Sequence, residues 1–77
     1  MIWHDRPVDL NPVALRTIRE LAGFSQAELA RRTGISQGHI SQLESGQKRP
    51  RPQTVRLLAD HLGVPLGSLL SPVRRDR

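Results

Sequence analysis

The chain has 77 residues, enough for one small domain, and it contains no cysteine, which excludes disulfides and thiolate metal sites. Twelve Lys and Arg residues against seven Asp and Glu give a formal charge of +5 and a pI near 11.6, which favours polyanionic partners such as nucleic acid. No apolar run approaches the roughly 20 residues of a membrane span and no signal-peptide pattern opens the chain, so we expect a cytoplasmic protein without a membrane partner.

Helix caps and glycine stops predict four helices and a short fifth one. In chain order, the predicted segments run from Asn11-Pro12 to Gly23, from Ser25 to Gly34, from Ser36 to Gly46 and from Pro52 to Gly63, followed by a turn holding Leu66, Leu69 and Leu70. Their apolar residues recur at helical spacing, at Ala14, Leu15, Ile18, Leu21, Ala22, Leu29, Ala30, Val55, Leu58, Ala59 and Leu62. The sequence therefore predicts an all-α domain over residues 11–71, between an N-terminal arm (1–10) and a basic tail (72–77).

The third predicted helix has two unlike faces. With an advance of about 100° per residue, Ile40 and Leu43 point to the core and His39 and Glu44 lie on the borders. The remaining arc carries short polar residues: Gln37, Gly38, Ser41, Gln42 and Ser45. Such a face suits the DNA major groove, where Gln pairs with adenine and Ser with several base edges. The alternative is a solvated Ser/Gln-rich helix with an accidental glycine.

The surroundings of this helix favour the DNA hypothesis. The glycine-containing joint Thr33-Gly34-Ile35 is typical of a helix-turn-helix. Gln26 begins the preceding helix, where free backbone N–H groups and a side-chain amide can hold a phosphate. A basic loop follows the third helix and is placed to meet the DNA backbone; its cations are Lys48, Arg49 and Arg51.

The run SQAELARRTGISQGHISQLESGQKRP resembles the Cro/phage-repressor helix-turn-helix family, also called the XRE family. The similarity extends over about residues 15–70, and its motif elements are Gln26-x-x-Leu29-Ala30, Gly34-Ile35, Ile40-Ser41-x-Leu43-Glu44-x-Gly46 and Leu62-Gly63-Val64. The resemblance implies a compact five-helix bundle of the lambda-repressor-like type, with the helix-turn-helix in helices 2 and 3. It also implies binding to operator DNA as a homodimer.

The resemblance implies a role for individual residues. The base-reading positions are occupied by Gln37, Gly38, Ser41 and Gln42. The phosphate-facing positions are occupied by Gln26, Ser45, Lys48, Arg49 and Arg51. Ser36 and His39 are further candidate phosphate contacts, and His39 could equally be an exposed border residue. Arg19 and Glu44 match a pair that family members join in a partly buried ion pair. Pro65 stands where a cap of the fifth helix is usual.

We therefore expect a sequence-specific DNA-binding transcriptional regulator, and specifically a repressor, that reads a short, roughly palindromic operator with the helix at about residues 36–45. The three histidines share no metal-ligand spacing and no catalytic constellation is visible, so we expect neither a cofactor nor an enzyme. Two alternatives stay open: an antitoxin-like module that binds a protein partner, and the DNA-binding portion of a longer regulator. Trp3 could pack on the helices or anchor a partner.

Overall fold

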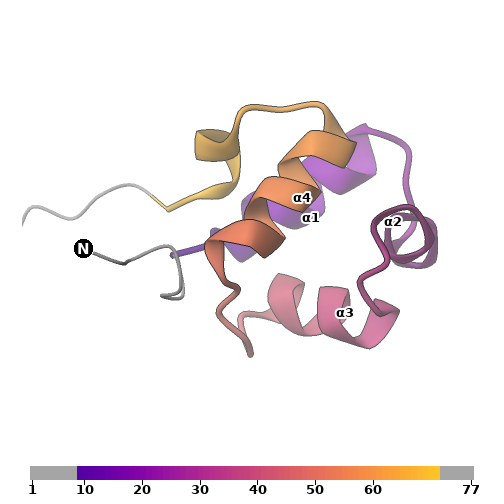
Figure 1. Cartoon of the computed structure of the whole chain (residues 1–77), viewed down its shortest axis with the longest axis horizontal. Helices are drawn as coiled ribbons and strands as arrows, with labels where there is room; N and C mark the ends of the chain where they lie inside the picture. Colours follow the sequence, from indigo (N-terminus) through magenta and orange to yellow (C-terminus); the bar gives the residue numbers. More distant parts are fainter. Residues whose placement is uncertain (1–8, 72–77) are drawn as a thin grey trace, which may run out of the picture.

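A computed structural model describes residues 9–71 of the chain. They form four α-helices, α1 (Pro12–Leu21), α2 (Gln26–Thr33), α3 (Gln37–Ser45) and α4 (Pro52–Leu62), and one turn of 3-10 helix, η1 (Leu66–Leu69). In Figure 1, α3 forms the lower edge of the molecule and η1 lies on the upper side. Trp3, Arg6 and most of the predicted arm, together with the basic tail and its arginines, lie outside the described residues.

The helix boundaries follow from local capping, as the sequence predicts. Asn11 accepts the N–H of Ala14 through Oδ1 at 3.1 Å, and Ser25 and Ser36 accept in the same way from residues 28 and 39. Left-handed glycines end α2, α3 and α4, with φ angles of 80°, 82° and 71°. At α4, Arg51 occupies the cap position without a capping hydrogen bond.

The core fills the space between all five elements. Leu15, Leu29, Ile40 and Leu43 bring α1, α2 and α3 together, and each is fully buried. From the C-terminal half the core receives Val55, Leu58, Ala59, Leu62 and Leu69. Phe24 packs against this cluster while partly exposed. Because α3 contributes only two side chains to the core, most of its surface is free for another role.

The prediction of a fifth α-helix is wrong. Residues 66–69 form a single 3-10 turn, and Leu70 leaves it in an extended conformation. Pro65 supplies no side-chain cap, and Gly67 adds backbone freedom to a segment of only four residues. The turn is retained because Leu69 is fully buried against the core.

The last apolar residues of the first predicted helix do not face the core, although they share the helical spacing of residues that do. Leu21 is 82% exposed, and Ala22 likewise faces solvent. Arg19 occupies the inward position near this end of the helix and is only 7% exposed. Hydrophobic spacing does not predict which residues of this turn are buried, because a charged residue, not an apolar one, fills the interior there.

The two ends of the described chain meet in an isolated antiparallel bridge between Leu10 and Leu70. The backbone N–H of Asn11 donates to the carbonyl of Leu69 at 2.8 Å, and that of Ser71 donates to the carbonyl of Asp9 at 2.8 Å. The bridge closes the domain by tying the entry of α1 to the exit of η1. None of the described helices has the length and apolar character that a membrane crossing requires.

Candidate nucleic-acid interface

α2 and α3 form a helix-turn-helix with a tight joint. Gly34 adopts a φ of +80°, a conformation that L side chains rarely reach, and the chain changes direction within the three residues between α2 and α3. The hydroxyl of Thr33 donates to the carbonyl of Leu29 at 2.8 Å and accepts the N–H of Ile35 at 3.2 Å. These bonds satisfy the backbone at the joint and fix the direction in which α3 leaves it.

The outer face of α3 carries the predicted base-reading residues. Gln37, Gly38 and Ser41 are exposed and Gln42 is half-buried, while Ile40 on the other face is fully buried. The exposed side chains are short and can both donate and accept hydrogen bonds. The arrangement of the helix therefore agrees with the faces expected from the sequence.

Gly38 has no role in the packing of the domain itself. A Cβ atom built on Gly38 meets no heavy atom within 4 Å, and the residue has an ordinary helical φ. Glycine inside a helix is about 0.5–1 kcal/mol less favourable than alanine. Neither the fold nor the local backbone of the described chain therefore requires glycine at this position.

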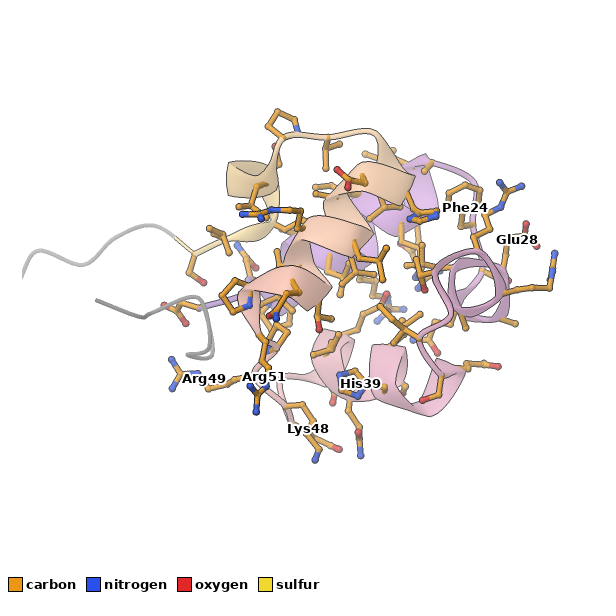
Figure 2. All side chains as sticks on the ribbon, viewed as in Figure 1. Phe24, Glu28, His39, Lys48, Arg49 and Arg51 are labelled. Carbon is orange, nitrogen blue, oxygen red and sulfur yellow. The ribbon has the colours of Figure 1, made fainter. Side chains whose placement is uncertain are left out.

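The end of α3 directs the chain into the basic loop, residues 47–51. Gly46 turns with a φ of +82°, and the carbonyl of Gln42 accepts the N–H of Gln47 at 2.9 Å. Lys48, Arg49 and Arg51 are all exposed. Figure 2 shows the three side chains projecting from the molecule at the edge that α3 forms.

The positive charge of the described domain is unevenly neutralised. On α1 and α2 the arginines are paired with carboxylates: Arg16 and Arg19 with Glu20 and Glu44, and Arg31 and Arg32 with Glu28. Lys48 and Arg51 form no ion pair with another described residue, and Arg49 has only a 3.9 Å contact with Asp9. In Figure 2 Glu28 lies at the end of the molecule remote from the basic loop. Arg56 on α4 is also exposed and has no ion pair with a described residue, but the other described cations that lack a close carboxylate all lie in the basic loop that follows α3.

A buried ion pair holds α3 against α1. Nε of Arg19 donates to Oε2 of Glu44 at 2.6 Å and Nη2 donates to Oε1 at 3.1 Å, with the two side chains only 9% and 5% exposed. Nη1 of Arg19 donates to the carbonyl of Phe24 at 2.7 Å. Such a two-bond fork fixes relative orientation as well as distance. The ion pair therefore sets how α3 is presented.

The charged states of this pair reinforce one another. Burial by itself raises the pKa of Glu44, but the hydrogen bonds from Arg19 and Gln26 and the positive charges of Arg19 and Arg16 together outweigh it, so the pKa of Glu44 is lowered. The hydrogen bond to Glu44 raises the pKa of Arg19, against the opposing effect of burial. Both groups remain ionised at neutral pH.

Gln26, a predicted phosphate contact, is engaged inside the domain. Its Nε2 donates to Oε1 of Glu44 at 3.0 Å, which links the first residue of α2 to α3. One hydrogen of the amide is thereby used, and the side chain is half-buried. No sequence spacing indicates this bond, because 18 residues separate the partners. The structure gives Gln26 a positioning role that the sequence did not predict.

The remaining predicted phosphate contacts differ from one another in their hydrogen bonds and their exposure. The hydroxyl oxygen of Ser36 caps α3 by accepting the N–H of His39 at 3.1 Å, and the hydroxyl of Ser45 donates to the carbonyl of Gln42 at 3.1 Å. His39 lies half-buried on α3 (Figure 2). Within residues 9–71 no group of three or more His, Asp or Glu side chains could hold a metal ion.

Comparison with known proteins places these observations in a family. A helix-turn-helix family model (HTH_3) matches residues 15–69. An uncharacterized HTH-type transcriptional regulator of Mycobacterium bovis is 40% identical over 55 residues, which are 71% of this chain and 22% of that protein. The chain thus spans about a fifth of the length of that relative. An uncharacterized HTH-type transcriptional regulator of Sinorhizobium fredii is 38% identical over 55 residues, 71% of each chain.

The fold is also similar to that of a solved structure. The crystal structure of a hypothetical transcription factor, NHTF, from Neisseria superposes with a TM-score of 0.75 at 28% identity and covers 86% of each chain.

Proposed function

Because the chain belongs to the helix-turn-helix family HTH_3, as its resemblance to the Cro/phage-repressor proteins predicts, we propose that it is a sequence-specific DNA-binding transcriptional regulator. We further propose that it acts as a repressor on a short, roughly palindromic operator and binds there as a homodimer. The relatives are named as regulators, in line with the expectation that the chain is not an enzyme.

One observation carries this proposal: the exposed polar face of α3 lies at the same edge of the molecule as the basic loop (Figure 2). Cations without carboxylate partners attract phosphates, which position a protein on the duplex, and the amides and hydroxyls of α3 read base edges. Gly38 supports the same proposal. Glycine destabilises the helix here and no contact within the domain requires it, whereas the absence of a side chain would allow a base or phosphate to approach the helix closely.

We assign the base contacts and the phosphate contacts to different residues. Gln37, Ser41 and Gln42 contact bases, with Gly38 allowing close approach, and Lys48, Arg49 and Arg51 contact phosphates. For Gln26 we propose that the backbone N–H groups at the start of α2 face the phosphate, since its side-chain amide is bonded to Glu44. The Arg19–Glu44 ion pair keeps the reading helix at a fixed angle to the rest of the domain.

Selection of bound duplexes from a random DNA library at moderate salt, with the mass of the protein measured in parallel, tests the proposal. We expect an enriched inverted repeat whose half-sites lie about 34 Å apart, the spacing of two recognition helices in successive major grooves. A single enriched half-site would retain DNA reading and reject the homodimer. Binding without any enriched sequence that vanishes as salt rises would reject sequence-specific regulation and favour a protein partner.

A further inference from the structure

Asp9 places a negative charge beside the basic loop. Its Oδ1 lies 3.9 Å from Nη2 of Arg49, and both side chains are 69% exposed. Among the described residues this is the ion pair that engages a cation of the basic loop. The sequence gives no signal for it, since Asp9 precedes α1, Arg49 follows α3, and the two residues belong to no common motif.

The backbone, and not only a long side chain, brings Asp9 to this place. The carbonyl of Asp9 accepts the N–H of Ser71 at 2.8 Å in the bridge that closes the domain. A few residues on, α1 begins against the end of α3, where a Cβ atom built on Gly46 would lie 3.8 Å from Cγ of Pro12. Asp9 is thus attached to the fold through its backbone, while its side chain faces Arg49 of the basic loop.

The other described carboxylates have different positions and partners. Glu20, Glu28 and Glu44 neutralise arginines of α1 and α2, and Asp60 lies exposed on α4 without an ion pair to a described residue. Asp9 alone among these lowers the positive charge at the place where a phosphate is expected.

We propose that Asp9 is an affinity-setting residue that competes with a DNA phosphate for Arg49; this inference rests on the function proposed above. A phosphate that binds Arg49 must displace the carboxylate of Asp9 and then remain close to its negative charge. Both effects weaken the phosphate contact on every duplex by the same factor, because neither involves a base. Asp9 therefore limits binding strength without reading sequence.

Removing the charge of Asp9 should measurably increase the affinity for DNA. An exposed pair of this kind has an interaction that corresponds to a factor of about 1.4 to 5 in an equilibrium constant. Asp9→Asn should therefore bind DNA more tightly by a factor of about 1.4 to 5, on operator and unrelated duplex alike. The gain should shrink as salt rises, because the screening length falls from about 10 Å at 0.1 M to about 3 Å at 1 M.

The test measures dissociation constants for the whole chain on an enriched duplex and on an unrelated duplex, at three salt concentrations. Asp60→Asn is the matched control, because it removes the same charge from an exposed position with no ion pair among the described residues. Far-UV circular dichroism melts verify that each variant is folded. The double variant Asp9→Asn/Arg49→Gln tests whether Asp9 acts through Arg49.

We expect Asp9→Asn to tighten binding on both duplexes, Asp60→Asn to leave it unchanged, and the gain to disappear when Arg49 is already Gln. Equal effects of the two Asn variants would overturn the proposal, since they would reflect net charge alone. A gain that persists in the double variant would also overturn it. If the wild-type chain binds no duplex at all, the proposed function fails as well, whereas wild-type binding that Asp9→Asn does not alter rejects only the role of Asp9.

Discussion

Replacing Glu44 by Gln tests how much of the domain depends on the ion pair between α1 and α3. The carboxylate accepts two hydrogen bonds from Arg19 and one from Gln26, and its side chain is only 5% exposed. An amide of the same shape keeps the volume but leaves the guanidinium of Arg19 buried without a counter-charge. Breaking one side of a buried pair costs about 3–5 kcal/mol.

A loss of this size is a large part of the stability of a small domain, which is about 5–15 kcal/mol. For 60–100 residues each kcal/mol lowers the melting temperature by about 4–8 °C, so Glu44→Gln should lower it by roughly 12–40 °C. Urea denaturation followed by far-UV circular dichroism measures the effect as a lower midpoint with an unchanged slope.

The control is Glu20→Gln, which breaks an exposed pair with Arg16 and a 3.9 Å contact with Arg19 but leaves both hydrogen bonds between Arg19 and Glu44; it should cost about 0.3–0.5 kcal/mol. The double variant Arg19→Met/Glu44→Leu removes both buried charges and should recover much of the loss. The reasoning is refuted if Glu44→Gln lowers the free energy of unfolding no more than Glu20→Gln does. It is also refuted if the double variant loses as much stability as Arg19→Met and Glu44→Leu lose together when each is made alone.

Three further results are expected. Because the pKa of Glu44 is lowered in the folded domain, its stabilising effect is fully present above the unfolded pKa of about 4.3 and is lost as the pH falls through the lower folded value. The midpoint of urea denaturation should therefore stay constant from pH 7 to 5 and fall below pH 4. Gly38→Ala should stabilise the free domain by about 0.5–1 kcal/mol, whereas Gly34→Ala, at a φ of +80°, should destabilise it by about 1–2 kcal/mol; paired thermal melts would contradict this if both shifted alike. In DNA titrations, Gln37→Ala should cost about 1–3 kcal/mol at particular bases, and Lys48→Ala should weaken all duplexes and lower the salt slope by about one unit. Equal weakening of every duplex by Gln37→Ala would reject the assigned reading face.

The sequence predicts those parts of the fold that depend on neighbouring residues. Asn11, Ser25 and Ser36 cap the helices they were expected to cap, because a cap involves a side chain and a backbone N–H three residues away. The two faces of α3 were likewise predictable, since its apolar residues share one helical period.

Features that depend on distant residues were not predictable in the same way. The exposure of Leu21 results from the buried ion pair that occupies the interior beside it, and hydrophobic spacing treats all apolar residues alike. The bond from Gln26 to Glu44 and the contact of Asp9 with Arg49 join separate elements whose approach is set by packing. The short 3-10 turn exists because Leu69 is buried, although the local sequence disfavours a full helix.

The bridge between Leu10 and Leu70 also determines how the domain can be joined to other polypeptides. Since the first and last described residues are hydrogen-bonded neighbours, a segment attached before Asp9 and a segment attached after Ser71 would leave from the same corner of the fold. A short peptide could connect the two ends and allow new termini to be opened in an exposed loop, as in a circular permutant. For the same reason the domain could be inserted whole into a surface loop of a host protein. In either arrangement the attached chain would start beside the basic loop, which Asp9 contacts through Arg49.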